Sequence, residues 1–261
     1  MTESPDSGSH SPPDNASSIG TPGLPERVPW SVGDGVGVLV AFVVSMMFFA
    51  LLANALTPST RGAPELLGTA GASALTLGLA YTLVRDRAPY NSTVFSVLCA
   101  ECRPLFSSVL RAVPPLLVGA AAYFAVGWGQ TTILRKIGIS PETIPRQQAV
   151  EIMLQSRSVT VAGMVVAFAV LIAPVVEETV FRGVLYLPIR SRLGPAAAGL
   201  LVSIVFAGVH NYAWGFPHLL IVGLTLTAVF EATGTLLAPV TVHALYNVVR
   251  VTVLWAQGGM G

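Results

Sequence analysis

The chain has 261 residues, of which 53% are hydrophobic and only 10% are charged. Soluble domains carry roughly 25% charged residues, so this composition excludes an ordinary soluble domain and indicates an integral membrane protein. The formal net charge of +1 gives no sign of a nucleic-acid partner or of an acidic partner.

The N-terminal stretch, residues 1–30, is rich in Ser, Pro, Gly and Asp and has almost no large apolar side chain before Leu24. Such a segment cannot bury enough surface to fold. We therefore predict a disordered tail over residues 1–30 and one folded domain over residues 31–261. The tail has no basic stretch followed by an apolar core, which argues against a cleaved signal peptide.

The rest of the chain consists largely of apolar segments. A membrane-spanning helix needs about 20 mostly apolar residues. Segments that approach this length are residues 36–56, 66–84, 113–134, 159–176, 195–210, 217–230 and 236–255. Residues 85–112 mix arginines with apolar residues and form either an interfacial helix or a further spanning piece. The predicted fold is an all-α, polytopic membrane helix bundle of about seven or eight transmembrane helices.

We assign no catalytic role to several features that lie between or beside these segments. Residues 140–157 alternate apolar and polar faces, which predicts an amphipathic helix at the membrane interface. Cys99 and Cys102 form a C-x-x-C, but a zinc site needs two more ligands nearby and none is evident, so we interpret them as loop cysteines. His218 and Glu231 are interpreted as residues of the two membrane interfaces, with Glu231 isolated.

A charged stretch follows directly on the uncharged segment 159–176. Glu177, Glu178 and Arg182 occupy three of six consecutive positions, and a charge in hydrocarbon costs at least ~2.5–3.5 kcal/mol. Residues four apart share a helix face, so Glu178 and Arg182 can pair, while Glu177 lies about 100° round the helix. The spacing therefore predicts one neutralised carboxylate and one free carboxylate, which can act as a base.

Two later segments place polar side chains inside apolar helices. His210 ends F-A-G-V-H, and His243 and Asn247 lie four apart in H-A-L-Y-N. The turn predicted at Gly194–Pro195 lies almost midway between Glu177 and His210, so in an antiparallel pair both lie about 25 Å from it. From the turn at Gly234, the side chains of 243 and 247 lie about 13 and 19 Å along their helix. The match is good to a turn or so, and at that precision all four groups can converge at one depth.

Such a set of side chains suits hydrolysis without a covalent intermediate. A carboxylate and an imidazole can hold and deprotonate one water, and a second imidazole with an amide can stabilise the oxyanion formed when that water attacks a carbonyl.

The three motifs in this order resemble those of the CAAX-protease and bacteriocin-processing family of intramembrane proteases, which includes the Ras-converting endopeptidase. That family carries E-E-x-x-x-R, F-x-x-x-H and H-x-x-x-N. This chain has E-E-T-V-F-R at 177–182, F-A-G-V-H at 206–210 and H-A-L-Y-N at 243–247. The resemblance covers about residues 115–256, and the ordered trio is more specific than any one motif.

The resemblance implies a helical membrane endopeptidase. The site residues it implies are Glu177, Glu178, Arg182, His210, His243 and Asn247. Glu177 would be the base with His210 as its partner on the water, and His243 and Asn247 would hold the oxyanion. Glu177, His210 and His243 could instead supply a zinc site of two histidines and one carboxylate. No H-E-x-x-H occurs, and we favour the metal-free mechanism, with no cofactor.

The expected partners are membrane lipid and a membrane-associated peptide or protein substrate, with no nucleic acid. The expected location is a multi-pass position in the plasma membrane of a prokaryote. The competing interpretation is a non-catalytic membrane scaffold or immunity protein that keeps the fold. A transporter is disfavoured because the chain shows no convincing internal repeat.

Overall fold

The computed structural model describes residues 24–56, 63–87, 105–140, 143–144, 150 and 159–256, which are mostly helical. Most of the predicted interfacial helix at 140–157 lies outside these residues, as do Cys99 and Cys102. The helical elements are α1 (Val32–Leu56), α2 (Ala63–Arg87), α4 (Leu105–Lys136), α6 (Val159–Ala167), η2 (Phe168–Ile172), α7 (Ala173–Glu178), η3 (Thr179–Tyr186), α8 (Leu187–Val209), η4 (Ala213–Gly215), α9 (Phe216–Thr233) and α10 (Leu237–Ala256). The described residues include no strand, so the all-α class is confirmed.

Each of the seven predicted apolar segments lies on a helix, to within a residue or so. By length and hydropathy, five stretches of the described residues can cross a membrane: Val32–Leu52, Ser108–Lys136, Ala162–Val209, Ala213–Thr233 and Leu237–Leu254. The 48-residue stretch contains two of the predicted segments. It is divided at Gly194, whose φ of 77° is available to glycine at little cost and marks the predicted turn. The chain is therefore an integral membrane helix bundle.

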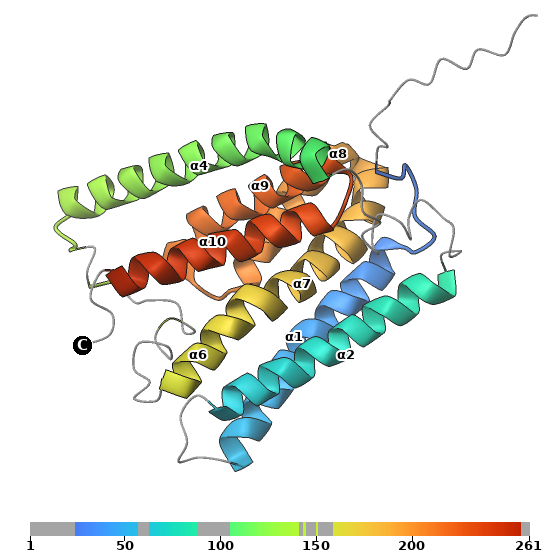
Figure 1. The fold of residues 1–261 in the computed structure, drawn as a ribbon, viewed down its shortest axis with the longest axis horizontal. Helices are drawn as coiled ribbons and strands as arrows, with labels where there is room; N and C mark the ends of the chain where they lie inside the picture. Colours follow the sequence, from blue (N-terminus) through green and yellow to red (C-terminus); the bar gives the residue numbers. More distant parts are fainter. Residues whose placement is uncertain are drawn as a thin grey trace, which may run out of the picture.

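In the view of Figure 1, α7, which ends at the two glutamates, lies between α10 on one side and the pair α1 and α2 on the other. On one side, α1 and α2 form a closely packed hairpin, and α1 also contacts η3. On the other side, α10 contacts η2, α7 and α9, while α4 covers α9. The α1–α2 approach is close at Gly68, where an added Cβ would lie 2.9 Å from the carbonyl oxygen of Phe49.

The centre of the bundle is formed by η3 and the parts of α8 and α9 that pack on it. The largest fully buried side chains include Arg182, Tyr186, Phe181, Phe206 and Phe230. The outward faces of the peripheral helices carry apolar side chains. On α4, for example, Phe124 and Trp128 are 74% and 75% exposed. In a bilayer this exposed surface faces lipid, while the charged side chains of Glu178 and Arg182 are enclosed by protein.

The packed domain begins before residue 31, where the sequence placed its start. Leu24 and Trp30 are buried, and the indole Nε1–H of Trp30 donates a hydrogen bond to the carbonyl oxygen of Val184 at 2.9 Å. Residues 24–30 of the predicted tail therefore contribute to the core.

Candidate active site

The site is built on a helix with unusual backbone geometry. Two π-helical segments, η2 and η3, flank the six-residue α7 that ends at Glu178. A π turn widens the helix and alters the direction of neighbouring side chains, and such turns occur frequently at functional sites. The carbonyl oxygen of Ala169 in η2 accepts a hydrogen bond from Asn247 at 2.7 Å, as that of Val184 in η3 does from Trp30. The π segments are thus fixed by side chains from α10 and from the N-terminus.

Glu178 and Arg182 form the pair that the i, i+4 spacing predicts. Nη1 of Arg182 lies 3.0 Å from Oε1 of Glu178, and both side chains are fully buried. Nη2 of Arg182 donates to the carbonyl oxygen of Gly223 on α9 at 2.8 Å, and the guanidinium carbon lies 4.9 Å from the ring centroid of Phe206. The ion pair therefore joins η3 to α8 and α9.

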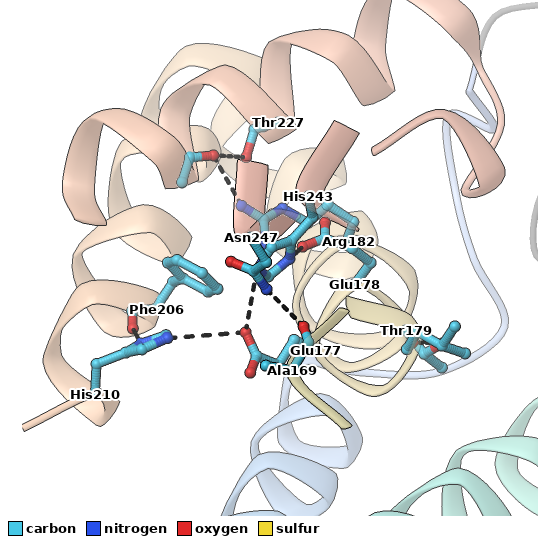
Figure 2. Close-up of polar contacts among 12 residues, drawn as sticks. Ala169, Glu177, Glu178, Thr179, Arg182, Phe206, His210, Thr227, His243 and Asn247 are labelled. Carbon is cyan, nitrogen blue, oxygen red and sulfur yellow. Dashed lines mark hydrogen bonds and ion pairs between the residues drawn. The ribbon is translucent and has the colours of Figure 1, made fainter. Parts of the chain in front are cut away.

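Glu177 lies on a different face of the same helix and lines a cavity of about 520 Å³. Its side chain is 18% exposed, whereas that of Glu178 is not exposed at all. Figure 2 shows the two carboxylates diverging, with Glu177 directed toward His210 and Glu178 toward His243. The difference in environment predicted for the two neighbouring glutamates is present.

The two histidines approach a single oxygen atom of Glu177. Nε2 of His210 and Nε2 of His243 each lie 3.8 Å from Oε2 of Glu177. This separation is too long for a direct hydrogen bond and is of the size that one bridging water spans. Oε2 is enclosed and has no hydrogen-bond partner among the described residues. The structure thus brings His210, from the end of α8, and His243, from α10, to the free carboxylate.

In each histidine the hydrogen-bond partner of Nδ1 determines which ring nitrogen carries a proton. Nδ1 of His210 lies 2.6 Å from the carbonyl oxygen of Phe206, and because a carbonyl only accepts, Nδ1 must be the donor. Nδ1 of His243 lies 2.8 Å from Oε1 of Glu178, a carboxylate already paired with Arg182. Nε2 of each ring therefore remains to interact with whatever lies beside Glu177.

Asn247 lines the same cavity one helical turn beyond His243. Its Nδ2 donates one hydrogen to the carbonyl oxygen of Ala169 at 2.7 Å, which leaves the second amide hydrogen available. Figure 2 shows the amide beside the carboxylate of Glu177. The cavity wall therefore carries a base candidate, two imidazoles and an amide donor.

The segment that contains all of these side chains matches a known family. Residues 160–249 match the family model described as type II CAAX prenyl endopeptidase Rce1-like. This segment is an Rce1-like domain. The resemblance seen in the motifs is confirmed, and the family supports a membrane-embedded endopeptidase. No curated protein and no solved structure matches the chain.

Glu177, His210 and His243 are the side chains that the sequence offers as a zinc set. Ligands at about 2.0–2.1 Å in a tetrahedral zinc site lie roughly 3.4 Å from one another. Each imidazole Nε2 is instead 3.8 Å from Glu177 Oε2, and no three His, Cys, Asp or Glu residues of the described chain are grouped so that they could hold a metal ion. Chelation and metal analysis of the active protein test the zinc alternative.

Several polar contacts at the site and beside it were not predicted from the sequence. Glu231 is not isolated: its carboxylate accepts hydrogen bonds from Tyr186 and Arg190. Arg250 also lines the cavity, and its Nη1 lies 3.4 Å from the hydroxyl oxygen of Tyr123. His218, which was expected at an interface, packs on Tyr123 with ring centroids 4.7 Å apart and lines a second, smaller cavity.

Proposed function

We propose that this protein hydrolyses a peptide bond of a membrane-associated protein or peptide, with Glu177 as the general base. The supporting observation is the buried Oε2 of Glu177, which has no protein donor among the described residues and faces Nε2 of both histidines at equal distance. A water placed there donates one proton to Glu177 and one hydrogen bond to the unprotonated Nε2 of His210. That water is held by two acceptors and keeps a lone pair directed into the cavity.

The proposed reaction proceeds through a tetrahedral oxyanion. Glu177 takes a proton from the water as the oxygen forms a bond to the carbonyl carbon. Nε2–H of His243 and the free amide hydrogen of Asn247 donate to the oxyanion. As the C–N bond breaks, Glu177 returns the proton to the leaving nitrogen, so the products are a carboxylate and an amine.

This role requires His243 to carry a proton on both ring nitrogens, since Nδ1 already donates to Glu178. The charges of the cluster accommodate that state. Glu177 and Glu178 contribute two negative charges, and Arg182 and a protonated His243 contribute two positive charges. A neutral cluster is the least costly arrangement of four ionisable groups inside a membrane protein.

The residues that line the cavity indicate an apolar substrate. Among the lining residues, α1 contributes Phe42, Val43, Met46, Met47 and Ala50. Apolar walls with few polar groups are typical of sites that bind an apolar chain and orient it at one end. We propose a substrate segment that is itself apolar or carries a lipid, which accords with the prenyl endopeptidase description of the family.

Comparison of protein termini in membranes tests the proposal. Cells producing the wild type, Glu177→Gln or Glu231→Gln would be compared by mass spectrometry of the termini in their membrane fractions. Glu231→Gln makes the same carboxyl-to-amide change outside the site and is the matched control. New termini should occur with the wild type and the control, and be absent with Glu177→Gln.

The purified, reconstituted wild type should then cleave a synthetic peptide that spans the new terminus. Identical termini from all three strains would support the non-catalytic scaffold instead. Cleavage of the peptide by purified Glu177→Gln at the wild-type rate would remove Glu177 from the mechanism.

A further inference from the structure

Arg250 occupies a position on the cavity wall that the hydrolytic mechanism does not use. It lies three residues beyond Asn247 on α10, about 4.5 Å further along the helix axis. It lines both the cavity that contains Glu177 and the second cavity of about 210 Å³. A cation inside a membrane bundle is costly, so its presence indicates a function.

The guanidinium of Arg250 is held by neutral groups. Nη1 lies 3.4 Å from the hydroxyl oxygen of Tyr123 and 3.3 Å from that of Tyr246, and the two hydroxyls are 3.3 Å apart. The guanidinium carbon lies 5.9 Å from the ring centroid of Tyr246. These contacts orient the side chain across α10 and α4, but they do not neutralise its charge.

The other arginines of the bundle interior differ in this respect. Arg182 is paired with Glu178, and Arg190 with Glu231. Among the residues that the structure describes, no carboxylate lies within 4.0 Å of the Arg250 guanidinium. Arg250 therefore retains a positive charge and hydrogen-bond donors for an external anion.

The position of Arg250 favours a substrate group over a lipid headgroup. Val248, Val249 and Val253 of the same helix are 41%, 53% and 46% exposed and face outward, whereas Arg250 turns inward to Tyr123 of α4. It shares the catalytic cavity with Glu177 and Asn247. An extended peptide advances about 3.3 Å per residue, so a group bound by Arg250 lies within a few residues of the bond that is cleaved.

We propose that Arg250 is a substrate-binding residue that recognises a carboxylate of the peptide close to the scissile bond. Arginine binds carboxylates with paired, charge-assisted hydrogen bonds. The carboxylate is either the C-terminal one, which every peptide carries, or that of an acidic side chain. This inference rests on the proposed function for the identity of the cavity as a peptide site, but its test measures binding without turnover.

The probes are three short peptides: N-acetyl-trileucine with a free carboxylate, the same peptide as its amide, and N-acetyl-Leu-Leu-Asp amide. Binding to the purified full chain in nanodiscs would be measured by thermophoresis, with Glu177→Gln as the host protein so that no cleavage occurs. The free acid should bind on the order of 10–100-fold more tightly than the amide, because hydrogen bonds to a charged group are worth about 1.5–3 kcal/mol. Tighter binding of the Asp amide than of the trileucine acid would assign the site to an acidic side chain.

Variants at Arg250 should abolish this preference. In Arg250→Gln the acid and the amide should bind alike, while Arg250→Lys should retain part of the difference. Arg192→Gln, which removes an exposed cation from α8, is the matched control and should bind as the host protein does. Should Arg250→Gln fail to fold, Arg250→Lys still tests the assignment, because a preference for the acid as large as that of the host protein would exclude paired hydrogen bonds from the guanidinium.

Equal binding of all three probes by the host protein would overturn the proposal. A second outcome would assign Arg250 to a lipid headgroup instead. In that case the thermal midpoint of the protein would rise in phosphatidylglycerol vesicles but not in phosphatidylcholine vesicles, Arg250→Gln would lose this rise, and the three probes would bind alike. Because the readout is binding, a preference for the acid with no detectable cleavage by the wild type would contradict the proposed function alone.

Discussion

The imidazole of His243 and the carboxylate of Glu178 lie 2.8 Å apart, and this contact joins the proposed oxyanion site to the buried ion pair. Glu178 Oε1 accepts from Arg182 Nη1 at 3.0 Å as well, so one oxygen atom receives both contacts. The carboxylate therefore orients the imidazole and is shared between the imidazole and the guanidinium. A change at Glu178 should alter stability and catalysis together, whereas a change at Glu177 should affect catalysis alone.

The first prediction concerns Glu178→Gln. The substitution leaves the fully buried Arg182 without its counter-charge, and breaking a buried pair in this way costs about 3–5 kcal/mol. The midpoint of thermal unfolding in detergent should fall well below that of Glu177→Gln, whose side chain is partly exposed in the cavity. Residual activity should be measurable in Glu178→Gln and absent in Glu177→Gln. If Glu178→Gln were the inactive variant and Glu177→Gln retained activity, the roles of the two glutamates would be reversed.

A second prediction tests the oxyanion donor. Asn247→Ala removes the amide, and loss of one such donor typically lowers the rate by about 10²–10³-fold. The value of kcat should fall while KM changes little, because the interaction forms only in the transition state. Asn247→Asp, which keeps the size but cannot donate while ionised, should be at least as slow. Since Asn247 also bonds to Ala169, a fall in the unfolding midpoint with kcat unchanged would show that its role is structural.

The predictable parts of this structure are those set by residues near one another in the chain. The pairing of Glu178 with Arg182 follows from helical periodicity, and the break at Gly194 follows from the Gly-Pro signal. Together they bring His210 back toward Glu177 at the depth calculated from the turn. The distinction between the two neighbouring glutamates was therefore available from spacing alone.

Other features depend on contacts between distant segments. The contact of Arg190 with Glu231 links residues 41 positions apart, and that of Arg250 with Tyr123 links residues 127 positions apart. The two residues of each pair lie on different helices, so helical periodicity cannot predict either contact. The π-helical segments could not be predicted from the sequence either. Their wider turns are held by hydrogen bonds from distant residues, such as Trp30 and Asn247, and no local sequence pattern marks them.

A third prediction tests the close approach of α8 and α9. An added Cβ at Gly223 would lie 2.9 Å from Cβ and 3.1 Å from Cα of Ser203, so the two helices would have to separate. Gly223 is also the residue whose carbonyl oxygen accepts from Arg182. Gly223→Ala should therefore destabilise the fold by about 1–3 kcal/mol, as overpacking does, and lower the thermal midpoint.

The control for Gly223→Ala is Gly163→Ala. Gly163 lies on α6, and no atom of the described residues lies within 4 Å of an added Cβ there. Alanine also favours helix more than glycine does. Its midpoint should be unchanged or slightly raised. Equal midpoints for the two variants would mean that the approach at Ser203 does not limit packing.

The last prediction compares the glutamate mechanism with a zinc mechanism, since Glu177, His210 and His243 are the residues that both would use. A catalytic zinc needs unprotonated Nε2 atoms from both histidines, and stripping it by a chelator should abolish activity until zinc is restored. Under the glutamate mechanism His243 instead carries a proton on Nε2, and its Nδ1 is held by Glu178. Activity should then survive exhaustive treatment with chelator, and elemental analysis of the active protein should find well below one zinc per chain. The 3.8 Å distances from Glu177 Oε2 to both rings leave room for either species, so the chelation experiment decides between the two mechanisms. Stoichiometric zinc that is lost and regained together with activity would overturn the proposed mechanism while leaving the endopeptidase assignment intact.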